Sequence, residues 1–333
     1  MSLTSSSADL GDREEETLEE SKKIPVLVIV GPTASGKTAL AIEAAKYYGG
    51  EVVSADSMQI YRKMDILSAK PTPEEMEGVP HHMIDVKDPG ETFSVADYVT
   101  MAGQAVRDIN ERKKLPIVCG GTGLYVDSLM KNVSFSEENH DDALRKELYR
   151  LAETEGAEKV HAILKDLDPE AAETIHPNNV IRVVRAIEVC KLTGRTFTET
   201  KRANLGSESP FAPLYIRLDF EDRQRLYDRI NKRVDLMLER GLLDEVKALL
   251  EIKNRSTAFN AIGLKEWIPY FEKTATLESC TEKCKQATRN YAKRQLTWFR
   301  KNDESKVIFV DNLGHPAEIF KTCKKIVAKC NFL

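Results

Sequence analysis

A glycine-rich segment near the start of the chain has the residue types needed to hold a phosphate group. The pattern GxxxxGK[ST] is matched by Gly31, Pro32, Thr33, Ala34, Ser35, Gly36, Lys37 and Thr38. The glycines let backbone N–H groups point inward, and the positive end of a following helix faces the same space. Lys37 adds a mobile positive charge, and the Thr38 hydroxyl can ligate Mg²⁺. The segment therefore predicts a cradle for a diphosphate group, with Mg²⁺ as a cofactor.

The acid that phosphoryl transfer usually requires is not evident. Kinases and NTPases commonly have a second strand that ends in an acid, which organises Mg²⁺ and water. Here the apolar run that ends at Cys119 continues into Gly120. Asp311 follows another apolar run, but it lies far along the chain and is better interpreted as a turn residue. The missing acid argues against a kinase or NTPase function but does not exclude it.

Asp56 is a second candidate for chemistry. It follows a short strand pattern at residues 51–54, and ligands of α/β sheets bind at the carboxyl ends of the strands. A carboxylate in that place can accept a proton from a nucleophile. On its own, Asp56 is interpreted equally well as a cap or turn residue.

Alternating strand and helix patterns must position these groups. The expected strands are residues 26–30, 51–54, 115–119, 214–218 and 307–310. The expected helices are residues 38–48, 94–113, 221–250 and 281–301, with Ser94 and Asp97 forming a capping box. Strands and helices that alternate at this spacing predict an α/β fold with a P-loop NTPase-like parallel sheet flanked by helices.

The chain divides into three parts. Residues 1–23 are polar and mostly acidic, and we expect a disordered tail. Residues 24–130 and 206–333 carry the strand patterns and form the predicted catalytic core. Residues 131–205 contain charged helical patterns without a convincing strand, which predicts an all-helical insertion domain.

The composition is that of an ordinary globular protein. Of 333 residues, 41% are hydrophobic and 31% are charged, which suffices for a substantial core. The net charge of -4 argues against a chain that is basic throughout, although a local basic stripe can still bind nucleic acid. No apolar run approaches the ~18–20 residues of a membrane span, and residues 1–23 lack the apolar core of a signal peptide.

Eight strings behind the phosphate-binding segment carry a family resemblance that extends from about Pro25 to the C-terminus. They are DSMQIYR (56–62), MDI (64–66), AKP (69–71), VPHHMID (79–85), FSVADY (93–98), GGTGLY (120–125), HPNN with RAIEV (176–179 and 185–189) and KRQLTWFR (293–300). In this order they resemble the tRNA dimethylallyltransferases of bacterial type.

That resemblance implies transfer of a dimethylallyl group from dimethylallyl diphosphate to the exocyclic amine of the adenosine just 3′ of the anticodon. This amine is a poor nucleophile because the ring delocalises its lone pair. The resemblance assigns the base to Asp56, a place near the adenosine to Thr122 and a diphosphate contact to Arg233. The phosphate-binding segment would then hold a leaving group, so no water needs activation.

The tRNA partner requires basic residues. Lys285, Arg289, Lys293 and Arg300 recur on one face of a predicted helix, which we interpret as a stripe for a phosphate backbone. The resemblance implies tRNA contacts by the insertion domain and by Ser57, Met58, Gln59, Arg182, Arg185, Gly263, Lys265, Arg289, Lys293 and Arg294. A base that enters a pocket must leave its stack, which favours the single-stranded anticodon loop.

Three alternatives remain. An adenylate isopentenyltransferase would prenylate free AMP, ADP or ATP. A P-loop small-molecule kinase would turn over ATP, and a non-catalytic nucleotide switch would leave Asp56 without a role. The expected protein is a cytoplasmic monomer with no membrane association.

Overall fold

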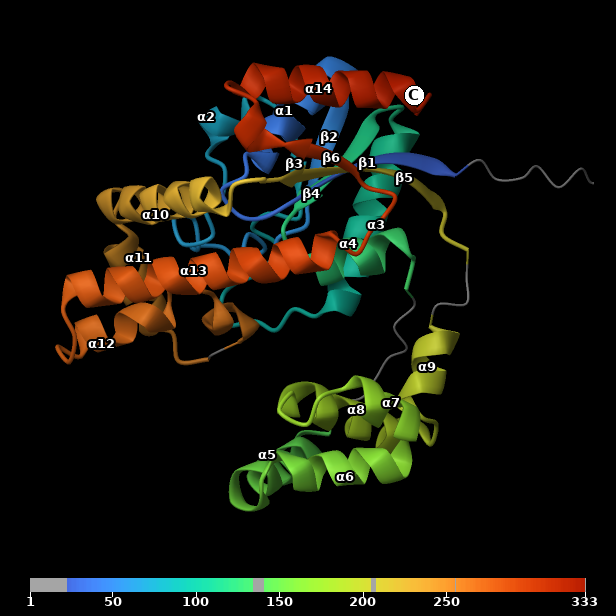
Figure 1. Ribbon diagram of the computed structural model, residues 1–333, viewed down its shortest axis with the longest axis vertical. Helices are drawn as coiled ribbons and strands as arrows, with labels where there is room; N and C mark the ends of the chain where they lie inside the picture. The colour runs from blue at the N-terminus through green and yellow to red at the C-terminus, as the bar shows by residue number, and fades with distance from the viewer. Residues whose placement is uncertain (1–22, 134–140, 205–207, 255, 333) are drawn as a thin grey trace, which may run out of the picture.

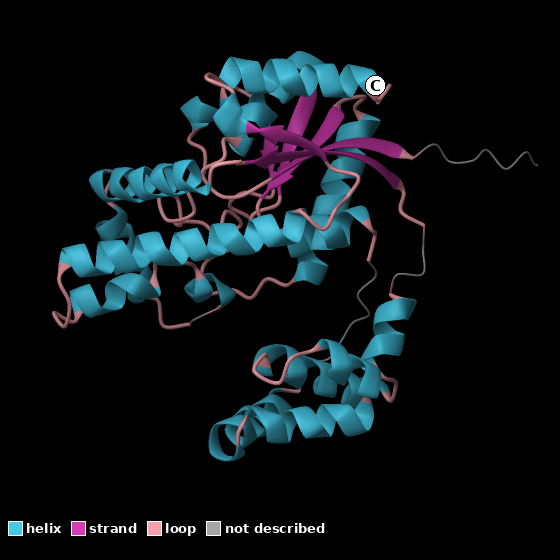
Figure 2. Cartoon of the chain, viewed as in Figure 1, coloured by secondary structure: helices cyan, strands magenta, loops and turns pink. Residues whose placement is uncertain are grey.

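A six-stranded parallel sheet forms the centre of the described molecule (Figures 1 and 2). The computed structural model describes residues 23–133, 141–204, 208–254 and 256–332. The strand order is β3-β2-β4-β1-β5-β6, and every pairing is parallel. The strands are β1 (Ile24–Val30), β2 (Gly50–Ser54), β3 (His81–His82), β4 (Leu115–Gly120), β5 (Phe211–Asp219) and β6 (Lys306–Phe309). The predicted fold class is confirmed, and β3 is a strand that the sequence did not predict.

Helices cover both faces of the sheet, and the central strand β1 is therefore buried on each side. Residues 26–30 of this strand are at most 2% exposed. Val26 and Val28 belong to one apolar cluster, whereas Leu27 and Ile29 belong to the other, as the alternation of side chains along a strand requires. The first cluster is completed by α3 (Val95–Glu111) and α4 (Gly123–Met130), and the second by α1 (Lys37–Tyr48) and α14 (Pro316–Lys329).

A layer of helices lies beyond the carboxyl ends of the strands (Figure 1). Its members are α10 (Arg223–Glu239), α11 (Leu242–Leu250), η1 (Thr257–Asn260), η2 (Lys265–Trp267), α12 (Ile268–Phe271) and α13 (Leu277–Phe299). The prediction of a single helix over residues 221–250 was wrong. Gly241 has φ of 96° and separates α10 from α11, since glycine adopts this left-handed conformation without strain.

A second group of helices stands apart from the sheet (Figure 1). It contains α5 (Asp142–Glu155), α6 (Ala157–Leu167), α7 (Pro169–Thr174), α8 (Val180–Thr193) and α9 (Phe197–Ala203). These helices enclose an apolar cluster of their own, in which Val160 and Leu164 are fully buried. The expectation of an all-helical insertion is met by the described residues, whereas its boundaries at 131 and 205 remain predictions.

The predicted acidic tail lies outside the described residues except for Lys23. A short helix, α2 (Pro73–Met76), follows the loop after β2. Within the described ranges, no helix is both long and apolar enough to cross a lipid bilayer.

Candidate active site

The phosphate-binding loop connects β1 to α1, as predicted. Gly31 allows a close approach to β5, because a Cβ atom there would lie 2.5 Å from the carbonyl oxygen of Leu218. Gly36 has φ of 92° and precedes the first turn of α1. The Nζ of Lys37 curls back over the loop and donates to the carbonyl of Pro32 at 2.7 Å. The loop is therefore a tight turn between β1 and α1 with the Lys37 ammonium folded over it, as the phosphate-binding pattern predicts.

Two groups in this loop indicate an anion. Burial lowers the pKa of Lys37 from 10.5 to about 8, because its ammonium group is removed from water without a carboxylate partner of its own. The hydroxyl of Ser35 is buried and has no hydrogen-bond partner within the described part of the chain. Buried polar atoms are normally paired, so the Ser35 hydroxyl is suited to bind an anion held by the same loop, and the Lys37 ammonium is suited to balance the anion's charge.

Gln295 of α13 joins this loop to the second glycine-rich loop. Its Oε1 accepts the backbone N–H of Thr33 at 2.8 Å, and its Nε2 donates to the carbonyl of Gly121 at 2.9 Å. A Cβ on Gly121 would lie 2.2 Å from that Nε2, which explains the glycine. The role of Gln295 was not predicted from sequence, because its partners are remote along the chain.

Asp56 stands at the carboxyl end of β2, in the loop predicted to carry the base. Its Oδ1 accepts the N–H of Met58 at 2.9 Å, which closes a tight turn. The Oγ1 of Thr122 accepts the N–H of Ser57 at 3.0 Å. Thr122 thus fixes the residue that follows Asp56, and the two predicted catalytic residues are brought together.

These loops open into a cavity of about 240 Å³. Its polar lining includes Thr33, Asp56, Ser57, Arg233, Asn260, Tyr291 and Arg294. Its apolar lining includes Met58, Leu67, Ile230, Val234, Met237, Leu242 and Ile262. One cavity therefore combines the phosphate-binding loop, a carboxylate, two arginines and an apolar wall.

Arg233 projects into the cavity from α10. Burial lowers its pKa, and the negative charge of Asp56 opposes that shift. Burial, followed by the charge of Asp56, raises the pKa of Tyr291 to about 12. An arginine kept in a desolvated cavity is suited to a strongly charged anion.

Arg229, one turn before Arg233 on α10, was missed by the sequence analysis. Its guanidinium lies 3.8 Å from the position of a Cβ on Gly36, and burial lowers its pKa. The spacing of four residues on one helix could have signalled it. Together with Lys37 and Arg233, it brings a third cation close to the phosphate-binding loop.

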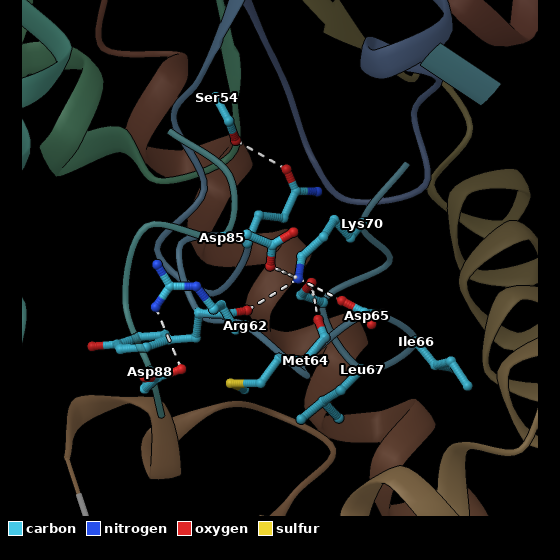
Figure 3. A network of polar contacts seen from close by, with 12 residues as sticks. Ser54, Arg62, Met64, Asp65, Ile66, Leu67, Lys70, Asp85 and Asp88 are labelled. Carbon is cyan, nitrogen blue, oxygen red and sulfur yellow. Dashed lines mark hydrogen bonds and ion pairs between the residues drawn. The ribbon is translucent and has the colours of Figure 1, made fainter. Parts of the chain in front are cut away.

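The loop after Asp56 is held by a polar network (Figure 3). The Nζ of Lys70 contacts Asp65 at 2.5 Å and Asp85 at 2.6 Å, and its side chain is only 6% exposed. Glu245 of α11 accepts the backbone N–H groups of three successive residues, at distances of 2.8 to 3.0 Å; they are Asp65, Ile66 and Leu67. This network fixes the segment that places Leu67 in the cavity wall.

Some of the residues predicted to contact tRNA line the cavity, whereas others lie elsewhere in the structure. Ser57, Met58, Gly263 and Arg294 line the cavity. Gln59 instead accepts a hydrogen bond from Ser54 at 2.9 Å and does not line the cavity.

The basic residues of the predicted stripe face α10 in part. Arg289 donates to Asn231 at 2.7 Å, and Lys293 lies over the Tyr227 ring. Lys285 is paired with Asp235 at 2.8 Å, and Arg300 with Asp219 at 2.8 Å. The stripe is therefore partly neutralised within the protein, and these two members are not free to bind phosphate.

Lys265 and Arg182 are exposed, and Arg182 lies on α8 in the separate helical group. Arg185, on the same helix, forms an ion pair with the buried Glu188. The proposed tRNA contacts of Arg182 and Arg185 are thus remote from the cavity along the chain and in the fold (Figure 1).

Together, the sheet, the phosphate-binding loop and the cavity define a P-loop protein whose loop adjoins a partly apolar cavity rather than a water-activating acid. Asp311 does not supply that acid, because its carboxylate caps a turn by accepting the N–H groups of Glu221 and Asp222. The family model for IPP transferase matches residues 59–302, so the chain belongs to this family.

Relatives of known name support the assignment over nearly the whole chain. A tRNA dimethylallyltransferase of Thermoanaerobacter sp. is 45% identical over 313 residues, covering 93% of this chain and 99% of the relative. One from Exiguobacterium sp. is 53% identical over 280 residues, covering 84% of this chain and 88% of the relative.

Two solved structures of transferases named for tRNA are also similar to this chain. The tRNA isopentenylpyrophosphate transferase of Bacillus halodurans is 42% identical, with a TM-score of 0.69 and coverage of 92% of this chain and 96% of that chain. A eukaryotic dimethylallyltransferase acting on tRNA is 31% identical, with a TM-score of 0.77 and coverage of 92% of this chain and 79% of that one.

Proposed function

We propose that this chain transfers a dimethylallyl group from dimethylallyl diphosphate to the exocyclic amine of an adenosine beside the anticodon of tRNA. The observation that carries the proposal is the single cavity shared by the phosphate-binding loop, Asp56 and an apolar wall. A diphosphate in the loop would place the allylic carbon toward Asp56, and the apolar wall suits a five-carbon hydrocarbon.

The proposed chemistry uses the charges described above. Asp56 accepts a proton from the amine as the new C–N bond forms, while the C–O bond to diphosphate breaks. Lys37, Arg229 and Arg233 stabilise the charge of the departing diphosphate. Thr122 holds the backbone beside Asp56 through Ser57.

Mg²⁺ fits this site. The ion keeps several waters and is bound by few protein groups together with substrate phosphates, so a dedicated cage of protein ligands is not needed. Thr38, exposed at the start of α1, would hold it, and the unpaired hydroxyl of Ser35 lies in the same loop. When bound, Mg²⁺ supplies additional positive charge to the leaving group.

The proposed acceptor is the anticodon stem-loop of a tRNA. Arg294, Ser57 and Met58 line the cavity where a base would enter, and Lys265 and Lys293 are exposed and available to phosphates. Arg182 would contribute from the helical insertion. We further propose a monomer that acts in the cytoplasm, where its tRNA substrates occur.

One assay separates this function from its alternatives. The protein is incubated with labelled dimethylallyl diphosphate and Mg²⁺, and unmodified tRNA, AMP and ATP are offered in parallel. The proposal expects label in tRNA alone. Label in AMP would identify an adenylate isopentenyltransferase, and phosphate release from ATP would identify a kinase.

A further inference from the structure

An exposed tryptophan lies beside the cavity described above. The side chain of Trp298, near the end of α13, is 40% exposed although it is one of the largest apolar groups in the chain. Its ring packs on Gly123, where a Cβ would lie 2.3 Å from the indole Cδ1. Its Nε1 donates to Asp127 at 3.0 Å. Both contacts come from α4, so the ring is fixed in one orientation while part of it faces solvent.

The position of this ring on α13 connects it to the cavity. Tyr291, Arg294 and Trp298 follow one another at spacings of three and four, which places them on one side of the helix. Tyr291 and Arg294 line the cavity, and Trp298 lies about 6 Å further along the helix axis than Arg294. Gly123, beneath the ring, directly follows Thr122. The exposed ring therefore lies on the same side of α13 as the cavity-lining residues Tyr291 and Arg294, one turn beyond Arg294.

The charges around Trp298 indicate what binds there. Arg294 precedes it by one turn and Lys301 follows it, and both are exposed. Neither has an ion-pair partner within the described ranges. Arg294 also lies over the Tyr291 ring, and the carboxylate of Asp127 is engaged by the indole N–H. An aromatic face flanked by two cations without ion-pair partners matches single-stranded nucleic acid, which is bound by base stacking and phosphate contacts together.

We propose that Trp298 is a stacking platform for an unpaired base next to the adenosine that enters the cavity. This role rests on the proposed function, since it requires an RNA acceptor. The target base leaves its neighbours when it enters the cavity, and a flanking base regains a stacking partner on the indole. A rigid ring suits this purpose because little side-chain freedom is lost on binding.

Tryptophan fluorescence provides a direct test, because the chain has only two tryptophans and the other, Trp267, is fully buried. The unaltered protein is titrated with an anticodon stem-loop RNA, and then with two versions that each lack one base flanking the target adenosine. We expect quenching by the intact RNA and loss of that quenching with one of the two abasic versions. Equal quenching by all three RNAs, or none, would overturn the platform.

Affinity measurements complete the test. Trp298→Leu keeps an apolar side chain without an aromatic face, and should weaken stem-loop binding about tenfold while leaving the KM for dimethylallyl diphosphate unchanged. Trp298→Phe should retain most of the affinity. Tyr47→Leu is the matched control, since Tyr47 is 61% exposed at the end of α1 remote from the loop. If Trp298→Leu binds RNA as the unaltered protein does, or if Tyr47→Leu weakens binding equally, the platform is excluded. Failure of the proposed function would instead appear as no transfer to tRNA by the unaltered protein.

Discussion

Gln295 accepts a hydrogen bond from the backbone N–H of Thr33 at 2.8 Å, although the two residues are 262 positions apart. The other end of the same amide donates to Gly121. A side chain on α13 therefore sets the spacing between the phosphate-binding loop and the loop that carries Thr122. We therefore infer that Gln295 links the loop proposed to bind diphosphate to the loop that holds the backbone beside Asp56.

Replacing the amide by a carboxylate should weaken diphosphate binding. In Gln295→Glu the second oxygen faces the carbonyl of Gly121, and a negative charge is placed beside the leaving group. We expect the KM for dimethylallyl diphosphate to rise about tenfold or more at saturating tRNA. Thr297→Glu, which adds the same charge on the exposed side of α13, should leave this KM unchanged. An unaltered KM in Gln295→Glu would remove Gln295 from the site.

The lowered pKa of Lys37 predicts a pH dependence. In the proposed function the protonated lysine attracts the diphosphate, and with a pKa of about 8 it loses its proton as the pH rises through that value. We therefore expect the part of kcat/KM for dimethylallyl diphosphate that depends on Lys37 to be near its maximum about one unit or more below pH 8, to be halved near pH 8 and to fall further above it. Lys37→Arg should bind less tightly but lose this decline, because arginine stays protonated. An identical decline in both proteins would contradict the assignment.

Glu245 is expected to stabilise the loop that forms one cavity wall. Its two oxygens accept three backbone N–H groups, whereas a glutamine would present an N–H₂ group to one side. Glu245→Gln should lower the free energy of unfolding by about 1–2 kcal/mol, measured in denaturant, and raise the KM for the prenyl donor. Glu239→Gln, at an exposed position near the end of α10, serves as the control and should change neither quantity.

Features of the fold and of the site could be predicted from sequence where the interacting residues lie close together along the chain. The phosphate-binding loop, five of the six described strands and Asp56 were predicted because each depends on consecutive residues, whereas β3 has only two residues and gives no periodic pattern. Gln295 and Glu245 were missed because their partners lie in segments remote along the chain. Lys285 was interpreted as free for the same reason, since Asp235 belongs to a different helix. The break at Gly241 is different, because a glycine at the end of a helical pattern is a local signal that could have been used.

A second pH effect should come from the opposite end of the sheet. Glu51 is buried, which by itself raises its pKa, but Lys114, His82 and Arg112 hold the pKa down to about 2. A depressed carboxylate pKa gives stability that is present above the ordinary value of 4.5 and is lost as the pH falls toward about 2. The Tm of the unaltered protein should therefore fall between pH 6 and pH 3. Glu51→Gln should have a lower Tm at pH 6 and a smaller fall in Tm over the same range.

The most direct test of the central claim is the single-turnover rate of dimethylallyl transfer to tRNA by Asp56→Asn. An asparagine keeps the shape of the side chain but cannot accept the proton from the amine. If Asp56 is the base, the rate should lie at least about 100-fold below that of the unaltered protein, with the Kd for dimethylallyl diphosphate unchanged within about twofold. Asp88→Asn, which alters an exposed acid paired with Arg62, should transfer at the normal rate. A normal rate in Asp56→Asn would exclude Asp56 as the base, and with it the proposed mechanism, because Asp56 is the one carboxylate among the described residues that line the cavity.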